Sequence, residues 1–413
     1  MIYLHVPFCG SFCTYCDFYS EVCRKESVFN EYADAVIAEV DSRREEILMN
    51  ISAPSAVRSF YIGGGTPSVL PLSVLRRVVG AVTALTGGAG NGLDGGFKGG
   101  QPVGRSGGLF DEFTVEVNPE DIVEKGDEYV GGLLALGVDR VSMGVQSFDD
   151  GILRWMNRRH DSERAVEAFR ILRRCGVRNI SLDLIFGISQ LTDEVWRNTV
   201  EKAVALAPEH ISAYQLSIEE GSALAGMVAD GRYVEASDEQ CRWQYDILCG
   251  ILARAGYHHY EISNFARPGF EAVHNSAYWR RVPYVGLGPG AHSFSGDVRS
   301  WNSQTLPHRR PSGGKAGDPA ASPADDLAGN PSGDLVTYSR NPETLTPEDI
   351  RVERIMLSLR TDLGLEAEEL YSLTQKGVVD ALLAEGSLER AGERVRIPES
   401  RFFTSDEIIR ALV

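Results

Sequence analysis

The chain of 413 residues lacks any apolar run of the roughly 20 residues that a membrane-spanning helix needs. Its N-terminus lacks a basic segment and a small-residue cleavage site, so we expect no signal peptide. Basic residues are also few, 41 Lys and Arg against 58 Asp and Glu, which gives a formal net charge of −17. Because general nucleic-acid binding requires a basic face, this composition argues against that function.

Cysteine is scarce, and the seven cysteines do not suggest a disulfide framework. Their number is odd, and Cys9, Cys13 and Cys16 lie within eight residues. In a reducing compartment such clustering indicates metal or redox chemistry, so we expect a cytoplasmic protein. The hydrophobic fraction of 43% is that of a globular protein with a large core and a second, smaller domain.

Short apolar runs rich in β-branched and aromatic residues alternate with amphipathic helical patterns in the N-terminal half of the chain. The expected strands cover residues 2–6, 59–64, 113–118, 140–145, 180–186 and 210–217. Strand–helix units in series predict a parallel sheet with right-handed crossovers. Polar motif residues recur at the strand ends, which favours an α/β fold with a partial (β/α)6, TIM-like barrel over a flat doubly wound sheet.

Composition predicts four divisions of the chain. They are a barrel core (1–235), an accessory α+β region (236–302), a flexible Pro/Gly-rich insertion (303–342) and a C-terminal helical, winged-helix-like domain (343–413). Residues 87–108, with eleven glycines, and residues 305–335 cannot bury a core, so we interpret both as surface insertions.

The three clustered cysteines are separated by three residues and then by two. Compact loops of this kind let several thiolates face one inorganic cluster. A structural zinc site usually has four ligands in two close pairs, and no second pair follows in this sequence, although Cys23 and His5 are alternative fourth ligands. Three ligands on a 4Fe–4S cluster leave one iron open, which is typical of a site where chemistry occurs.

This spacing, directly after the first expected strand, resembles the radical S-adenosylmethionine (SAM) superfamily. The resemblance implies that the amino and carboxylate groups of SAM chelate the open iron. It also assigns Gly64, Gly65 and Thr66, in "GGGTPS", to SAM. Glycines allow close backbone approach, and we expect exposed N–H groups at this turn, able to bind a carboxylate.

Four further polar residues are candidates: Glu116 at the end of the third expected strand, Gln146 at the end of the fourth, Arg158 in "MNRRH" just before the next helix, and Asp183 in "SLDLIFGI". Each is open to a structural interpretation, such as an ion pair between Glu116 and Arg140. Their convergence at one rim of a barrel favours SAM binding, since such folds keep ligands there.

The segments "YLHVPFC", "EVNPE", "RVSMGVQSFDD", "NRRH" and "LDLIFGI" resemble one branch of the superfamily, the anaerobic coproporphyrinogen III oxidases (dehydrogenases) and the heme chaperone HemW subgroup. This resemblance also places Tyr3 and Tyr15 beside SAM. The dehydrogenases have a fourth cysteine where this chain has Phe18, and an N-terminal arm before the first strand that we expect this chain to lack. The motif "HNSAYW" (274–279) is typical of the chaperones.

The same motif offers His274 as a candidate ligand of heme iron, beside aromatic faces that suit a macrocycle. Other candidate heme ligands are His258, His259, His292, Cys23 and Cys249.

The resemblance therefore implies a heme chaperone that carries a 4Fe–4S cluster, SAM and heme. Its expected partners are an acceptor hemoprotein and an electron donor such as flavodoxin or ferredoxin, and a homodimer is one expected assembly. The alternative is an oxygen-independent coproporphyrinogen III oxidase of porphyrin biosynthesis. A radical-SAM enzyme with another substrate and a zinc or electron-transfer module are further alternatives.

Overall fold

The computed structural model describes residues 1–52, 56–85, 109–305 and 338–413. Its centre is a nine-stranded sheet in the order β11-β1-β4-β5-β6-β7-β8-β10-β9. Six parallel strands in chain order form its middle: β1 (Ile2–Val6), β4 (Ser59–Gly64), β5 (Glu112–Val117), β6 (Arg140–Gln146), β7 (Asn179–Phe186) and β8 (His210–Gln215). This sequential order lacks the reversal that marks a doubly wound sheet, so the predicted partial barrel is confirmed.

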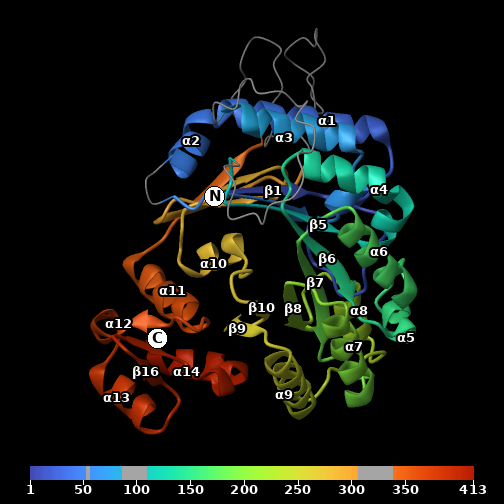
Figure 1. Ribbon diagram of the computed structural model, residues 1–413. Coiled ribbons are helices and arrows are strands. Elements are labelled where there is room, and N and C mark those ends of the chain that lie inside the picture. Colours follow the sequence, from blue (N-terminus) through green and yellow to red (C-terminus); the bar gives the residue numbers. More distant parts are fainter. Residues whose placement is uncertain (53–55, 86–108, 306–337) are drawn as a thin grey trace.

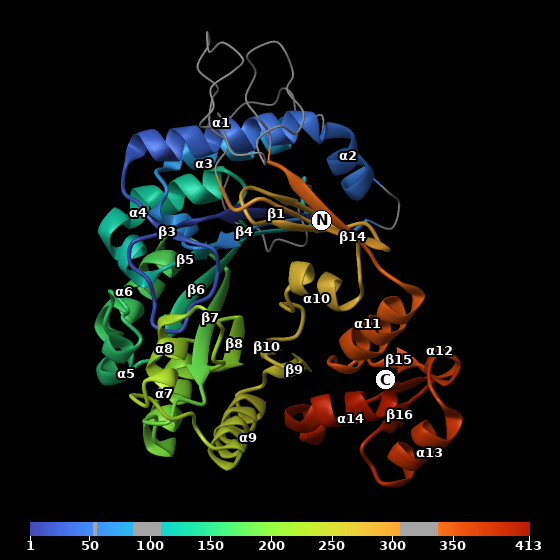
Figure 2. The same cartoon turned by 180° about the vertical axis from the view of Figure 1, so that it is seen from behind.

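Helices cover the outer face of this curved sheet, as Figures 1 and 2 show. They are α1 (Glu26–Ser42), α2 (Arg44–Ser52), α3 (Leu72–Leu85), α4 (Pro119–Ala135), α5 (Asp150–Trp155), α6 (Ser162–Arg174), α7 (Asp193–Ala205) and α8 (Ala223–Ala229). Local sequence fixes their ends. The Thr192 hydroxyl accepts the Val195 N–H at 3.3 Å and caps α7, and Asp161 caps α6 in the same way.

The alternation of residues along β6 explains why the two faces of the sheet differ. Val141, Met143 and Val145 are buried in the apolar core under the helices. The intervening residues Arg140 and Ser142 line a cavity on the inner face. Because successive side chains of a strand point to opposite faces, one strand supplies both the core and the polar interior.

The region 236–302, expected as an accessory unit, contributes strands to both edges of the same sheet. Strand β11 pairs in parallel with β1, and β10 pairs antiparallel with β8. Its elements are α9 (Asp238–Arg254), β9 (His258–Glu261), β10 (Asn264–Ala266), α10 (Val273–Trp279), β11 (Val285–Leu287), β12 (His292–Phe294) and β13 (Val298–Asn302). A second sheet contains β12, β13 and β14 (Arg340–Thr344).

The C-terminal region is mainly helical, as predicted, with a small sheet in the order β15-β17-β16. Its elements are α11 (Pro347–Leu359), β15 (Leu365–Glu366), α12 (Ala367–Leu373), α13 (Lys376–Ala384), β16 (Glu389–Ala391), β17 (Arg394–Arg396) and α14 (Ser405–Leu412). Glu353 of α11 forms ion pairs with Arg281, at 2.9 Å, and with Arg299, which join this region to the loop after α10 and to the second sheet.

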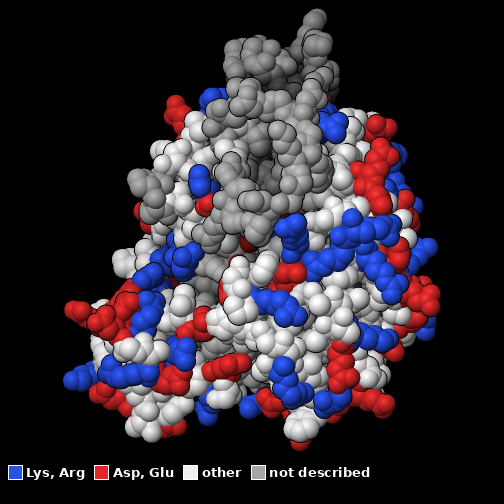
Figure 3. Space-filling model, in the orientation of Figure 1, with Lys and Arg blue, Asp and Glu red and all other residues white. Residues whose placement is uncertain are grey.

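The first predicted insertion, residues 87–108, lies outside the described residues, and so does almost all of 305–335. Within the described part of the chain, no helix is long and apolar enough to cross a membrane. On the face shown in Figure 3, acidic and basic side chains are interspersed.

Candidate functional site

The three clustered cysteines lie on a loop that is fastened at both ends and in its middle. Two short parallel strands, β2 (Phe8–Cys9) and β3 (Glu21–Val22), pair with each other and close the loop. The Thr14 N–H and hydroxyl donate to the carbonyls of Met156 and Trp155, at 3.1 and 2.9 Å. These bonds hold the cysteines over the carboxyl ends of the barrel strands.

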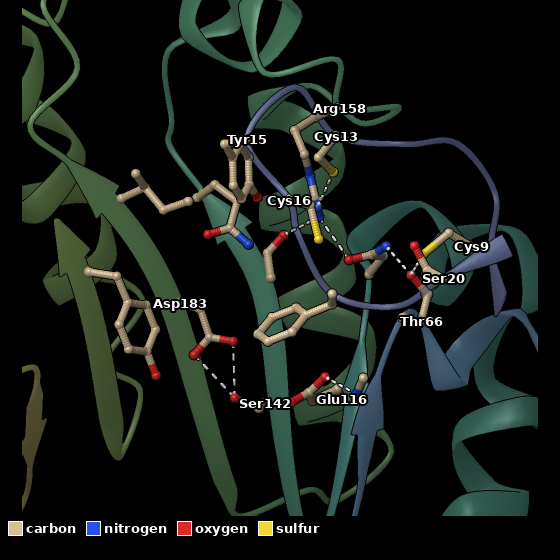
Figure 4. Close-up of a pocket in the computed structure, with 18 of the residues that line it drawn as sticks. Cys9, Cys13, Tyr15, Cys16, Ser20, Thr66, Glu116, Ser142, Arg158 and Asp183 are labelled. Atoms are coloured by element: carbon tan, nitrogen blue, oxygen red, sulfur yellow. Dashed lines mark hydrogen bonds between the residues drawn. The ribbon is translucent and has the colours of Figure 1, made fainter. Parts of the chain in front are cut away.

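A cavity of about 560 Å³ lies beneath this loop. Figure 4 shows the cysteines and Arg158 on one side of it, and Glu116, Ser142 and Asp183 on the other. The structure brings eleven of the predicted site residues together as its lining: Cys9, Cys13, Tyr15, Cys16, Gly64, Gly65, Thr66, Glu116, Gln146, Arg158 and Asp183.

The thiols have polar neighbours that suit metal ligands. The Thr66 hydroxyl donates to Cys9 Sγ at 3.5 Å. Burial raises the pKa of this thiol, although the Thr66 hydrogen bond opposes the shift. Burial also raises the pKa of Cys16 to about 11, so the thiol must lose its proton when it binds metal. Among the described residues, no three His, Cys, Asp or Glu side chains lie close enough together to bind a single metal ion. The thiolates of an iron–sulfur cluster each bind a different iron, so they are spaced farther apart than the ligands of one ion.

The glycine turn after β4 is built differently from the expectation of free N–H groups. The Gly64 N–H donates to Glu116 at 3.2 Å, and those of Gly65 and Thr66 donate to the carbonyls of Val6 and Phe8. That part of the prediction is wrong, because two of these amides bond to carbonyls of β1 and β2 and the third bonds to the Glu116 side chain. Gly64 has a φ of 107°, which favours glycine.

Glu116 lies across the cavity from the cysteine loop and accepts two hydrogen bonds. The Tyr61 hydroxyl donates at 2.7 Å and the Gly64 amide at 3.2 Å. Burial, opposed by the Tyr61 hydrogen bond and aided by the neighbouring Asp183 carboxylate, raises the pKa of Glu116 to about 7. No hydrogen bond or ion pair between Glu116 and Arg140 is found among the described residues, so the structural ion pair expected as an alternative does not form.

Asp183 and Gln146 complete this side of the cavity. The Ser142 hydroxyl lies 3.1 Å from both carboxylate oxygens of Asp183, and burial raises the pKa of this acid. Gln146 ends β6 with a positive φ of 65°, beside an irregularity in the register with β7. This conformation is costly for a non-glycine residue and is typical of functional positions.

Arg158 links the cysteine loop to the strand ends. Its Nη1 donates to Cys13 Sγ at 3.4 Å, and its Nη2 donates to Asn118 Oδ1 and to the Gly144 carbonyl, both at 2.7 Å. Its Nε has no partner among the described residues. The guanidinium is therefore held in place and keeps one donor for a ligand.

Two predicted residues, Tyr3 and His274, do not line the cavity. The Tyr3 hydroxyl is 3.1 Å from His5 Nδ1. His274 is 1% exposed, and its nitrogens contact the Ser59 hydroxyl at 2.8 Å and the Tyr278 hydroxyl at 3.0 Å. Burial lowers its pKa to about 3, so the imidazole is neutral, and in this conformation neither nitrogen is open to an iron.

The alternative heme ligands differ in access. His258 and His259 contact carboxylates of the C-terminal region, Asp362 at 2.9 Å and Glu399 at 3.1 Å. His292 is exposed, and its ring stacks on Trp301 with 5.8 Å between centroids. Cys23 and Cys249 are partly buried free thiols outside the cavity lining.

Comparison with known proteins identifies the family. Residues 3–203 match the model of the radical SAM superfamily. The chain is 33% identical to heme chaperone HemW of Lactococcus lactis, covering 74% of this chain and 72% of that one. It is 30% identical to heme chaperone HemW of Mycobacterium tuberculosis, covering 100% and 94%. The chain belongs to the HemW family of radical SAM proteins.

A solved structure shares the fold over nearly the whole chain. Coproporphyrinogen III oxidase (HemN) from Escherichia coli matches with a TM-score of 0.71 and 20% identity, covering 99% of this chain and 89% of that chain. At this identity the likeness shows the fold alone.

Membership of the radical SAM superfamily implies a 4Fe–4S cluster and SAM, and the cavity fits both. Three thiols on one wall suit the cluster, and the Arg158 Nε and two carboxylates suit the charged and hydroxyl groups of SAM. Sequence reasoning missed Tyr61 and Asn118, which hold Glu116 and Arg158 in place. Asn118 is a polar residue directly after the strand that ends in "VEV", and a polar residue at a strand end is the signal that identified Glu116 and Gln146.

We predict that SAM binding to this HemW protein weakens as the pH falls through about 7. Glu116 then takes up a proton and accepts hydrogen bonds from SAM less well. The affinity should fall up to about tenfold per pH unit, as expected for one proton. Calorimetric titration between about pH 6 and 8 measures this, with Glu116→Gln expected to flatten the slope and the exposed Glu368→Gln to leave it unchanged. An equal slope in Glu116→Gln contradicts the assignment.

Proposed function

We propose that this HemW protein is a cytoplasmic heme chaperone that binds heme and passes it to an acceptor hemoprotein. The observation that carries the proposal is the match to a heme chaperone over the full chain, at 30% identity and 94% coverage of the relative. The likeness to coproporphyrinogen III oxidase rests on fold, at 20% identity, and we do not propose that activity. Phe18, which lines the cavity and is 64% exposed, stands where the dehydrogenases are expected to have a thiol.

The cluster and SAM belong to the cavity in this proposal. Cys9, Cys13 and Cys16 hold the cluster, and Arg158, Glu116 and Asp183 orient SAM opposite it. When bound, the cluster supplies electrons that an external flavodoxin or ferredoxin renews. Phe12 and Phe18, which are 56% and 64% exposed, flank the cysteine loop and limit the access of water to it.

We propose His274 as the axial heme ligand, which requires α10 to move. The helix is held by the Glu112 carboxylate, which accepts the N–H groups of Val273 and His274 at 2.8 and 3.0 Å. The ring must also leave the hydroxyls of Ser59 and Tyr278. Heme binding is then coupled to the opening of a buried hydrogen-bonded element, which makes it slow.

We predict a slow phase when hemin is mixed with the full-length protein. Tyr278→Phe, which removes the hydroxyl bound to His274 Nε2, should speed this phase by about fivefold, the equivalent of one hydrogen bond of about 1 kcal/mol. His274→Ala should abolish saturable coordination. Stopped-flow absorbance in the Soret region measures both variants against the unsubstituted protein.

One observation favours a second ligand, His292, because its exposed imidazole stacks on Trp301 and needs no rearrangement. His292→Ala is therefore titrated in parallel. Loss of coordination in that variant, with His274→Ala unaffected, places the heme at His292. Absence of any saturable Soret change in the unsubstituted protein contradicts the heme proposal itself.

A further inference from the structure

Arg140 is a buried cation that its surroundings do not satisfy. It begins β6, is 1% exposed, and lines the cavity. Its Nε has no hydrogen-bond partner, and neither a hydrogen bond nor an ion pair to its guanidinium is found among the described residues. Buried charges in proteins are normally paired or hydrogen-bonded, so an arginine without an acceptor indicates a missing one.

Three carboxylates that interact electrostatically with Arg140 accept hydrogen bonds from other donors. Glu112 accepts two N–H groups at the start of α10, and Glu116 accepts from Tyr61 and Gly64. Asp183 accepts from Ser142 and Ser181. Glu112 and Asp183 attract the guanidinium through space and keep it charged despite its burial. They therefore stabilise the cation and leave its hydrogen-bond donors free.

The strand register places Arg140 deep in the barrel. In β6 it lies two residues before Ser142, which pairs with Glu116, while Arg140 itself pairs with Thr114. Arg140 is thus one layer farther than Glu116 from the cysteine loop. The Thr114 hydroxyl is fully buried and also lacks a partner among the described residues. The cavity lining also contains neutral donors from Ser212, Tyr214 and Asn275.

We propose that Arg140 forms a binding subsite for the carboxylate of a small-molecule ligand held at the bottom of the cavity, beneath the SAM position. A carboxylate matches the planar, bidentate geometry of the guanidinium. The subsite does not depend on heme binding, and it gives the barrel interior a second ligand besides SAM. Its occupant is a small organic acid, or a larger molecule with an acidic arm.

The stability of an Arg140→Met variant tests this in the ligand-free, full-length protein. A structural arginine stabilises the fold through its partners, so its removal lowers the unfolding temperature. Arg140 makes no hydrogen bond to the described residues, but its charge stabilises Glu112 and Asp183 through space, so Arg140→Met should lower the midpoint by less than Arg173→Met does. Arg173→Met is the matched control: it removes a guanidinium that contacts Glu209 at 2.7 Å, and its midpoint should fall.

Sodium propionate serves as the ligand probe, with sodium chloride at equal ionic strength as the reference. Propionate should raise the midpoint of the unsubstituted protein and of Arg173→Met, and Arg140→Met should lose the whole shift. The propionate-induced shift should persist when saturating S-adenosylhomocysteine is present. If S-adenosylhomocysteine abolishes the shift, Arg140 binds the carboxylate of the cofactor, and the proposal of a second ligand is overturned. A midpoint of Arg140→Met that falls as far as that of Arg173→Met, or a propionate shift that Arg140→Met keeps, overturns the subsite.

Discussion

Replacing Cys13 by serine is expected to abolish the iron–sulfur cluster of this protein. Cys13 is one of three thiols on the same wall of the cavity, and a serine hydroxyl does not replace a thiolate as ligand. Iron and acid-labile sulfide per chain should fall more than tenfold after anaerobic reconstitution, since even changes beyond the ligands cost ten- to hundredfold in metal affinity. Colorimetric iron and sulfide assays, together with visible absorbance, measure the loss.

Two other cysteines provide the controls for this result. Cys23 follows the loop closely in sequence, but it lies outside the cavity lining and its Sγ accepts the Lys25 N–H at 3.4 Å. Cys249 lies in α9 and is partly buried. Serine at either position should leave iron and sulfide unchanged. If Cys23→Ser loses the cluster and Cys13→Ser keeps it, Cys23 is a ligand of the cluster and Cys13 is not.

Substituting Gly65 by alanine should both destabilise the protein and prevent cluster assembly. An alanine Cβ at this position meets the Phe8 and Val6 carbonyl oxygens at 2.8 and 2.9 Å, and Cys9 Sγ at 3.1 Å. Backbone atoms of β1 and β2 must shift to make room, and Cys9 moves with them. We expect a loss of about 1–3 kcal/mol in the free energy of unfolding, as for other overpacked buried sites.

Gly80 supplies the matched control, because an added Cβ there meets nothing within 4 Å. It is exposed in the middle of α3, so Gly80→Ala should stabilise the helix by about 0.5–1 kcal/mol. Chemical denaturation of both variants, with iron analysis in parallel, measures the contrast. Normal stability and full iron content in Gly65→Ala would show that the turn does not position Cys9.

Patterns that depend on neighbouring residues could be predicted from the sequence. Apolar runs rich in β-branched and aromatic residues identified the six parallel strands, and the Thr192 cap of α7 is a local feature of the same kind because its hydroxyl acts on its own helix. The cysteine spacing, the glycine turn, the polar residues near strand ends and the family resemblance indicated eleven residues of the cavity lining. In parallel sheets the carboxyl ends of neighbouring strands meet, so such residues converge without further information.

Features that depend on distant pairing were not accessible in this way. Strands β10 and β11 have three residues each, too short for a periodicity that indicates which sheet edge they join. The motif around His274 did not indicate that its ring forms a hydrogen bond with the hydroxyl of Ser59, which is far away in sequence. Arg140 was considered only as a partner of Glu116, because an arginine at a strand start does not reveal that nearby acids are occupied.

The most direct test of the site is electron paramagnetic resonance of the reconstituted, dithionite-reduced protein before and after SAM is added. Three cysteine ligands leave one iron without a side chain, so SAM should change the g-values and line shape of the reduced cluster, and Arg158→Met should require a higher SAM concentration for the same change. An identical spectrum with and without saturating SAM, or one zinc per chain without sulfide, would contradict the assignment of this cavity to a SAM-binding cluster.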